Sequence, residues 1–315
     1  MLDVTVCILS FNRAAYLCEA VASVLAQSKA PQHIVVFDNG SEGIVLESMS
    51  GYLERGVRWV GSDVTRSAIW NFRRAVAEAK SEYVLVMHDD DRLCPGFLEE
   101  QIEYLDGNPE VIAVACNGYI IDEGGRRTGL TLLGNRVDSD VELYKCSAQV
   151  AMKYAGDSCI PFSSTVYRTR CVREIDFREE FGKVCDAVFF CDMADTGTIA
   201  FKSKALYECR VHPGQDSSHF PSEQMDKLEQ FFWARKSTSR LEIDLLHKSL
   251  IKQHTSRCIR IILEAMSAPG SPRHLFSEVA KIRNRMFSFS AALGILVYGV
   301  KKRLTEKWLK YKIQS

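Results

Sequence analysis

The chain has 315 residues, 46% of them hydrophobic, and its 40 basic and 40 acidic side chains cancel. This apolar content predicts a folded protein with a large core and excludes extensive disorder, and the length suits one large domain with an accessory region. The zero net charge gives no support to nucleic-acid binding. The eleven cysteines form no CxxC pair, and no signal peptide is recognisable, so we expect reduced thiols and a cytoplasmic protein.

The amino-terminal part of the chain alternates between apolar runs and helical patterns. Apolar runs predict strands at 4–9, 33–38, 57–60 and 83–87, and helical periodicity predicts helices between them at 14–27, 43–54 and 67–79. This order is typical of an α/β fold with a doubly wound, mostly parallel sheet and helices on both faces. Right-handed crossovers then bring the loops that follow the strands to one edge.

The pattern changes further along the chain. We predict a helix at 95–105, strands at 111–116, 160–168 and 199–211, a helix at 186–195, and loops or short strands at 118–157. From residue 222 the sequence is helical, with helices expected at 224–246, 248–265 and 272–315. We therefore expect an α/β domain at 1–218 and a helical region at 219–315.

Three consecutive carboxylates follow the strand predicted at 83–87. Asp89, Asp90 and Asp91 come directly after His88, and buried carboxylates that repel one another are stabilised by a cation. A second strand ends in the run 38–41, Asp-Asn-Gly-Ser. Because ligands of open α/β sheets gather at such strand ends, we expect one nucleotide and metal site here. The alternative for both runs is an ordinary polar turn.

Taken in order, several segments resemble the sequence blocks of glycosyltransferase family 2, whose members have the GT-A fold. They are Val4–Arg13, Asp38–Ser41, Asn71, His88–Pro95, Asp186–Gly197 and Tyr207–Gly214. The resemblance covers roughly residues 3 to 218. It implies sugar transfer from a nucleotide sugar, with a UDP-sugar as the expected donor, in the synthesis of a bacterial surface polysaccharide such as lipopolysaccharide or capsule.

The resemblance also implies the residues that bind the nucleotide. Asp38 is expected to accept the N3 proton of uracil, which a carboxylate can do, and Asp90 is expected to reach the ribose. Arg66 and Asn71 are expected beside the base, although Asn71 and Trp70 could instead pack within the protein. The full expected set is Ser10, Asn12, Arg13, Asp38, Arg66, Asn71 and Asp90.

The expected metal is Mn²⁺ or Mg²⁺. The resemblance implies that Asp91 binds it and that His212 approaches the metal or the diphosphate. The cation would neutralise the diphosphate oxygens. For His212 the alternative is a hydrogen-bonded histidine before a proline turn. His88 occupies the first acidic position of the family's motif, and its role is left open.

Asp186 is the expected catalytic base. A base that removes the acceptor hydroxyl proton on the face opposite the leaving group implies a single displacement with inversion. The family commonly has Glu before this Asp, whereas this chain has Cys185. Asp186 could also cap a helix, which does not exclude catalysis. Asp192 and Glu180 are the alternative bases.

The carboxyl-terminal segment is basic. Residues 273–315 carry ten Lys or Arg and two Glu, a net charge of +8, around an apolar stretch at 286–300. As a helix this stretch would be about 22 Å long, too short for a hydrocarbon core of about 30 Å. We expect peripheral contact with an anionic membrane, where a lipid-linked acceptor would be met. A core helix or a homo-oligomer contact is the alternative.

The sequence thus predicts an inverting, metal-dependent glycosyltransferase of the hexosyltransferase class that acts on a hydroxyl of a glycan or lipid-linked acceptor. A nucleotidyltransferase is the first alternative, but the loop after the first strand, 10–13, lacks the Gly-rich phosphate-binding pattern. A non-catalytic relative that serves as a binding partner is the second, because His88 and Cys185 depart from the family's pattern.

Overall fold

The computed structural model describes residues 1–133, 141–155, 159–214, 227 and 231. All of them belong to the first of two units into which the chain divides, Met1–Ile243 and Asp244–Ser315. The boundary predicted after residue 218, the basic segment at 273–315 and the helices predicted from residue 224 onward lie outside the described residues, apart from 227 and 231. They stay predictions.

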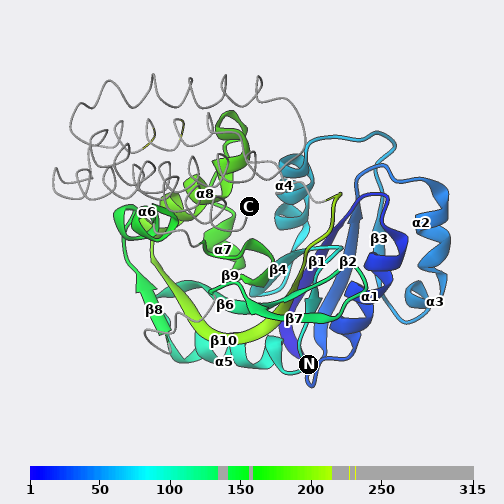
Figure 1. Cartoon of the computed structure of the whole chain (residues 1–315), viewed down its shortest axis with the longest axis horizontal. Coiled ribbons are helices and arrows are strands. Elements are labelled where there is room, and N and C mark those ends of the chain that lie inside the picture. The colour runs from blue at the N-terminus through cyan, green and yellow to red at the C-terminus, as the bar shows by residue number, and fades with distance from the viewer. Residues whose placement is uncertain (134–140, 156–158, 215–226, 228–230, 232–315) are drawn as a thin grey trace, which may run out of the picture. The chain divides into compact units, whose positions relative to one another are not determined.

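A single sheet of ten strands organises the described part of the chain (Figure 1). Its hydrogen-bonded order is β3-β2-β1-β4-β9-β6-β10-β5, with β7 beside β6 and β8 beside β10. The strands are β1 Leu2–Ser10, β2 Pro31–Asp38, β3 Arg58–Val60, β4 Tyr83–His88, β5 Arg92–Leu93, β6 Val111–Ile121, β7 Arg127–Thr131, β8 Val141–Tyr144, β9 Val166–Arg168 and β10 Thr198–Arg210.

The strand directions bring four carboxyl ends to one edge of the sheet. Strands β3, β2, β1 and β4 are parallel. Strand β9 is antiparallel to both β4 and β6, and β10 is parallel to β6. Strands β6 and β10 therefore run in the same direction as β1. The predicted mostly parallel, doubly wound sheet is confirmed, with short antiparallel strands added to it.

Helices connect and cover these strands. They are α1 Ala14–Leu25, α2 Gly43–Ser48, α3 Ser50–Leu53, α4 Ala68–Glu78, α5 Phe97–Gly107, α6 Ser147–Ala155, α7 Thr169–Val172 and α8 Cys185–Ala194, with 3₁₀ helices η1 Phe162–Ser164 and η2 Glu179–Val184. Helices α1 and α5 pack in one core cluster with Val4, Val6 and Ile8 of β1. On the other face, the Cys7 thiol donates to the carbonyl of Ala75 in α4. Because side chains alternate along a strand, both faces of β1 are covered, as predicted.

Three predicted elements differ from the structure. The helix predicted at 43–54 is divided into α2 and α3 at Met49. The strand predicted at 160–168 begins as η1, because the hydroxyls of Ser164 and Thr165 both donate to the Pro161 carbonyl and hold a turn. The prediction of loops or short strands at 118–157 missed helix α6, although β7 and β8 are indeed short strands.

Candidate active site

The candidate site lies at the edge where four strands end. Ser10, Asp38, His88 and Arg210 are the last residues of β1, β2, β4 and β10, respectively. Ser10 pairs with Asp38 in the ladder between β1 and β2, and Leu9 pairs with His88 in the ladder between β1 and β4. The polar residues at the ends of β1, β2 and β4, which are far apart in the sequence, are therefore neighbours in the sheet.

Three oxygen atoms at this edge are buried and lack a hydrogen-bond partner within the described residues. They are Ser10 Oγ, Asp38 Oδ1 and Asn71 Oδ1, on side chains that are at most 4% exposed. The Asn71 amide donates to the carbonyl of Phe37 at 2.7 Å, which fixes its oxygen next to the end of β2. Buried polar atoms are nearly always paired, so these acceptors fit a site that receives a polar ligand.

The second oxygen of Asp38 has a structural role. Asp38 Oδ2 accepts the backbone N–H groups of Gly40 and Ser41, at 3.1 and 2.9 Å. Gly40 has φ +80°, and a Cβ there would lie 2.9 Å from backbone atoms of Val64 and Thr65. The tight turn therefore needs glycine and also orients the carboxylate. The turn and binding interpretations of this run are compatible.

Arg66 lies at the rim of this region. The Asn39 side chain accepts the N–H of Arg66 and donates to its carbonyl, which fixes the Arg66 backbone. The exposed Arg66 guanidinium is 4.9 Å from the Trp70 ring, and that of Arg74 is 4.7 Å from the same ring. The predicted base-side residues Arg66 and Asn71 are thus both near the end of β2.

Asn12 joins the loops that follow β1 and β2. Its N–H donates to the Ser41 hydroxyl at 2.8 Å, and its side-chain oxygen accepts the Glu42 N–H at 2.9 Å. Its φ of 53° is in the left-handed region, which Asn tolerates better than most residues. The structure gives Asn12 a loop-forming role at the predicted nucleotide site.

Arg13 is the cation closest to the acidic run. Its Nε lies 3.1 Å from Asp89, and its Nη1 lies 2.5 Å from Asp90. Asp89 is fully buried and accepts the N–H of Phe11 at 3.0 Å, so it anchors the loop after β1. Burial raises the pKa of Asp89 to about 7, although Arg13 opposes the shift.

Asp90 is surrounded by basic groups. Its Oδ2 lies 3.2 Å from His212 Nε2. Burial alone would raise its pKa, but His88, Arg13 and His212 outweigh burial and lower the pKa. His212 also packs against the ring of Tyr16. The predicted His212 therefore lies in the acidic cluster, adjacent to Asp90.

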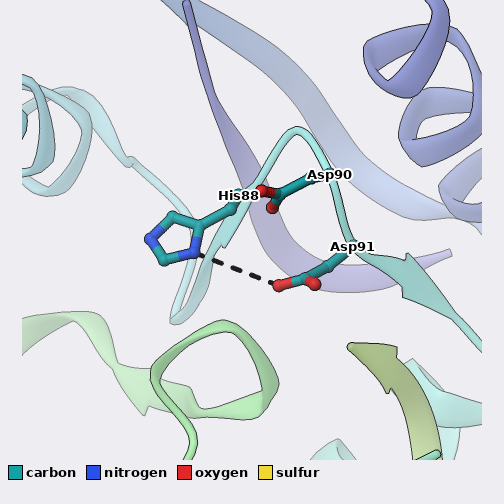
Figure 2. Close-up of side chains that lie close together, drawn as sticks. All are labelled: His88, Asp90 and Asp91. Atoms are coloured by element: carbon teal, nitrogen blue, oxygen red, sulfur yellow. Dashed lines mark ion pairs between the residues drawn. The ribbon is translucent and has the colours of Figure 1, made fainter. Parts of the chain in front are cut away.

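Asp91 is held from the end of β10. It accepts the backbone N–H of Arg210 at 3.1 Å and the Tyr207 hydroxyl at 3.4 Å. Burial, followed by the charge of Asp90, raises the pKa of Asp91 to about 7. Figure 2 shows His88 facing Asp91, with Nδ1 4.0 Å from the carboxylate.

A divalent cation fits this cluster. One ligand atom from each of His88, Asp90 and Asp91 lies within 4.8 Å of the others (Figure 2). Carboxylates and imidazole are both used by Mn²⁺, and a buried carboxylate with a raised pKa gains from a nearby cation. This set contains the predicted ligand Asp91. The set also includes His88 as a candidate ligand. His212 is not in the set but lies 3.2 Å from Asp90.

Asp186 lies in the first turn of α8 and is half-buried. Burial raises the pKa of its carboxyl to about 6, while the Ala187 N–H, which donates to it at 2.8 Å, and the Tyr154 hydroxyl oppose the shift. His88 also lowers the Asp186 pKa, so their charges interact. A carboxyl that titrates near neutrality suits a general base.

The alternative bases are in less suitable surroundings. Asp192 Oδ2 forms an ion pair with Arg178 at 2.6 Å, so this carboxylate already has a partner. Glu180 is exposed on η2. Cys185, which replaces the family's Glu, is half-buried, and burial raises its thiol pKa to about 12. Asp186 thus remains the best-placed candidate.

Sequence reasoning did not assign a role to several residues that shape the site. Asp89 anchors the loop after β1, and Arg210 and Tyr207 hold the acidic loop. Glu19 of α1 pairs with Arg210 at 2.6 Å. The position of Arg210 in a family-like block was a usable signal, but nothing local distinguishes Glu19 from other helix-surface acids.

Comparisons with known proteins identify the family. Residues 5–176, more than half of the chain, match the family model for glycosyl transferase family 2. An uncharacterized glycosyltransferase of Haemophilus influenzae is 22% identical over 236 residues, which cover 72% of this chain and 71% of that protein.

Solved structures show the same fold. The crystal structure of S. aureus TarS 1-349 in complex with UDP-GlcNAc aligns with a TM-score of 0.54 and 19% identity, over 93% of this chain and 75% of that one. The corresponding UDP complex gives 0.52 and 18%, over 93% and 74%. This likeness confirms the predicted GT-A fold. The family match over more than half of the chain shows that the chain belongs to glycosyltransferase family 2 and is a transferase enzyme.

Proposed function

We propose that this chain transfers a sugar from a UDP-sugar to a hydroxyl of a glycan or lipid-linked acceptor, with a divalent cation and with inversion at the anomeric carbon. One observation carries the proposal. The unpaired buried oxygens of Ser10, Asp38 and Asn71 share a strand-end edge with the His88, Asp90 and Asp91 cluster. That arrangement offers acceptors for a base and ligands for a metal–diphosphate.

The relatives support the donor class. TarS, which shares the fold, has been crystallised with UDP and with UDP-GlcNAc. A carboxylate such as Asp38 can accept the N3–H of uracil, whereas cytosine has no proton at N3. Family membership also favours glycosyl transfer over the nucleotidyltransferase alternative.

Asp186 is proposed to take the proton from the acceptor hydroxyl. With a pKa raised to about 6, its carboxylate is ionised at neutral pH yet more basic than an ordinary Asp. The acceptor oxygen then forms a bond to the anomeric carbon as the bond to the diphosphate breaks. One displacement from the face opposite the leaving group inverts that carbon.

The acidic cluster is proposed to hold the cation. His88, Asp90 and Asp91 would ligate it, and when bound it supplies positive charge to the departing diphosphate. Arg13 Nη1 and His212 Nε2 lie 2.5 and 3.2 Å from Asp90, on the segments that follow β1 and β10. We expect both side chains to interact with phosphate oxygens of the donor at that edge.

The acceptor side is supported by sequence features alone. The basic segment at 273–315 favours a peripheral contact with an anionic membrane and hence a lipid-linked acceptor. No helix in the described ranges has both the length and the hydrophobicity needed to cross a bilayer. Removing residues 286–315 is expected to weaken cosedimentation with phosphatidylserine vesicles. Equal sedimentation of the truncated and full chains would favour the core or oligomer interpretation.

A thermal-shift panel tests the proposed function. Nucleoside diphosphates and nucleotide sugars are added with and without Mn²⁺, and UDP compounds with Mn²⁺ are expected to raise Tm most. In Asp91→Ala the Mn²⁺-dependent part of the shift should vanish, together with donor hydrolysis and transfer, while the protein stays folded. A panel in which no nucleotide shifts Tm would contradict the proposal and favour a non-catalytic relative.

A further inference from the structure

We propose that Arg210 is a positioning residue, which acts with Glu19 to hold the carboxylates of Asp90 and Asp91 in the geometry that a divalent cation requires. The inference rests on the proposed metal site and extends it to a buried residue, Arg210, and to its ion-pair partner Glu19. Arg210 is 0% exposed, so it can act only through its neighbours.

Arg210 contacts the acidic loop twice. Its Nε donates to the backbone carbonyl of Asp90 at 2.9 Å, and its own N–H donates to the carboxylate of Asp91 at 3.1 Å. The first contact fixes the peptide between the two aspartates, and the second fixes a carboxylate oxygen. One residue at the end of β10 thus constrains both proposed ligands.

The guanidinium is itself fixed on three sides. Its Nη2 donates to Glu19 at 2.6 Å, and its Nη1 donates to the carbonyls of Asp122 and Glu123 at 3.3 and 3.0 Å. Its plane also lies 4.4 Å from the centre of the Tyr16 ring. Because the fork is rigid and each of its nitrogens donates at least one hydrogen bond, Arg210 has little freedom to let the acidic loop shift.

Glu19 connects Arg210 to the other side of the loop. The same Glu19 oxygen also pairs with Arg92, at 3.2 Å, and Arg92 directly follows Asp91. Arg92 in turn pairs with Glu208 of β10 at 2.8 Å and donates to the Gly125 carbonyl. Asp90 and Asp91 are therefore bracketed by two arginines that share one carboxylate.

The contacts made by Arg210, Glu19 and Arg92 oppose the repulsion between the buried carboxylates. Asp89, Asp90 and Asp91 are consecutive and at most 6% exposed, so their charges repel one another with little screening by water. Without support, such carboxylates would turn away from one another or toward water. Groups that orient metal ligands without touching the metal commonly change metal affinity by about 10–100-fold when removed.

Arg168 provides a matched control elsewhere in the protein. It is 5% exposed and, like Arg210, donates to several backbone carbonyls, those of Leu105, Asn108 and Val111. It also pairs with a partly exposed glutamate, Glu82. Arg168 ends β9, which runs antiparallel to β4, so it lies beside the start of β4 rather than the end. Its loss should disturb the fold without disturbing the metal ligands.

The test is an equilibrium titration of Mn²⁺, read from the electron paramagnetic resonance signal of the free ion with UDP present. Arg210→Lys and the less disruptive Glu19→Gln are compared with Arg168→Lys, Asp91→Asn and the wild type, and thermal unfolding is measured for each. Arg210→Lys is expected to weaken Mn²⁺ binding by about 10–100-fold and Glu19→Gln to weaken it in the same direction. Arg168→Lys should lower Tm with unchanged Mn²⁺ affinity.

Wild-type affinity in Arg210→Lys would overturn the inference, as would an equal loss in Arg168→Lys. If Arg210→Lys does not fold, unchanged binding in Glu19→Gln overturns it. These results leave the metal site intact as long as Asp91→Asn loses Mn²⁺. Absence of binding in the wild type, or full binding in Asp91→Asn, would instead overturn the metal site itself and the inference with it.

Discussion

At the scale of single residues, the surroundings of Asp186, the proposed catalytic base, predict how activity depends on pH. It lies in the first turn of α8, and burial raises its pKa to about 6. The helix N-terminus and the Ala187 N–H favour the charged form, so the carboxylate is retained at neutral pH. Protonation removes the base, and the rate should therefore fall as pH decreases through about 6.

Asp186→Asn is expected to reduce transfer by about 100-fold or more while UDP binding is retained, because only the proton acceptor is lost. Asp192→Asn is the control, since Asp192 lies on the same helix as Asp186 and its carboxylate is paired with Arg178. Transfer rates at saturating donor, measured from pH 5 to 8, check the prediction. The acid limb near pH 6 should be absent from the residual activity of Asp186→Asn. Should Asp192→Asn be the more damaging change, the base would be reassigned.

Asp38→Asn tests the proposed base recognition. The remaining side-chain oxygen can still accept the N–H groups of Gly40 and Ser41, so the turn is preserved. The amide that replaces the unpaired oxygen cannot accept the N3–H of uracil. We expect UDP affinity to fall by about tenfold or more, measured by calorimetry. The control Asp63→Asn, at an exposed position nearby in the chain, should leave UDP affinity unchanged. An unchanged UDP affinity in Asp38→Asn would mean that uracil binds elsewhere.

The residues that could be predicted from the sequence are those whose signal is local. Asp38 ends one strand pattern, and Asp91 lies in the acidic run that follows another. The two strands, β2 and β4, both pair in parallel with β1, so their carboxyl ends lie at the same edge. Asp89 was passed over because its partner, Phe11, lies 78 positions away. Glu19 and Arg210 are 191 positions apart, and no pattern of residue types predicts their pairing.

At the scale of elements, the approach of β6 to β10 supports the acidic loop. Gly118 of β6 pairs in register with Tyr207 of β10, and a Cβ at position 118 would overlap the Tyr207 ring. The Tyr207 hydroxyl reaches Asp91. The glycine therefore permits a ring position that places the hydroxyl at a proposed metal ligand.

Gly118→Ala is expected to cost about 1–3 kcal/mol of stability through overpacking and also to weaken Mn²⁺ binding. Gly197→Ala is the matched control, because a Cβ there meets Ile112 of β6 just as closely but at the other end of the same strand pair. Chemical denaturation and Mn²⁺ titration of both variants check this. Equal Mn²⁺ affinities in the two variants would show that Tyr207 does not support Asp91.

The elements that were mispredicted share a physical cause. Strand β9 pairs antiparallel with both β4 and β6, and the turn before it is set by hydroxyl bonds to Pro161. Helix α6 packs against α8, and the Cys191 thiol of α8 donates to the Ser147 carbonyl. In both cases specific contacts, local hydroxyl bonds at the turn and tertiary packing for α6, outweigh the propensity of the residue types.

At the scale of the whole molecule, the doubly wound order was predictable because β1, β2 and β4 of its parallel part are buried on both faces and read as apolar runs. The core residues of β1, β2 and β4 are nearly all inaccessible to solvent. The cluster that the fold assembles at the strand ends carries an energetic cost, however. Its carboxylates are buried, and the proposed cation would have to come from solution.

This cost predicts how stability depends on pH. The pKa of Asp89 and of Asp91 is raised from 3.8 to about 7, so the folded protein binds these protons more tightly than the unfolded chain. Their contribution to stability is therefore greatest below about pH 4 and is lost as pH rises through about 7. A cation replaces those protons, so the increase in Tm caused by Mn²⁺ should be larger at pH 8 than at pH 5.

Calorimetric scans at both pH values, with and without Mn²⁺ and UDP, measure this difference. Asp91→Asn supplies the decisive comparison, because a neutral amide removes one buried charge while nearly preserving the shape of the side chain. At pH 8 without metal, Asp91→Asn should unfold at a higher temperature than the wild type, yet gain nothing from Mn²⁺. A lower Tm for Asp91→Asn under those conditions would mean that the bonds from Arg210 and Tyr207 already offset the buried charge. The acidic loop would then be a stabilising element of the fold, which leaves less need for a metal.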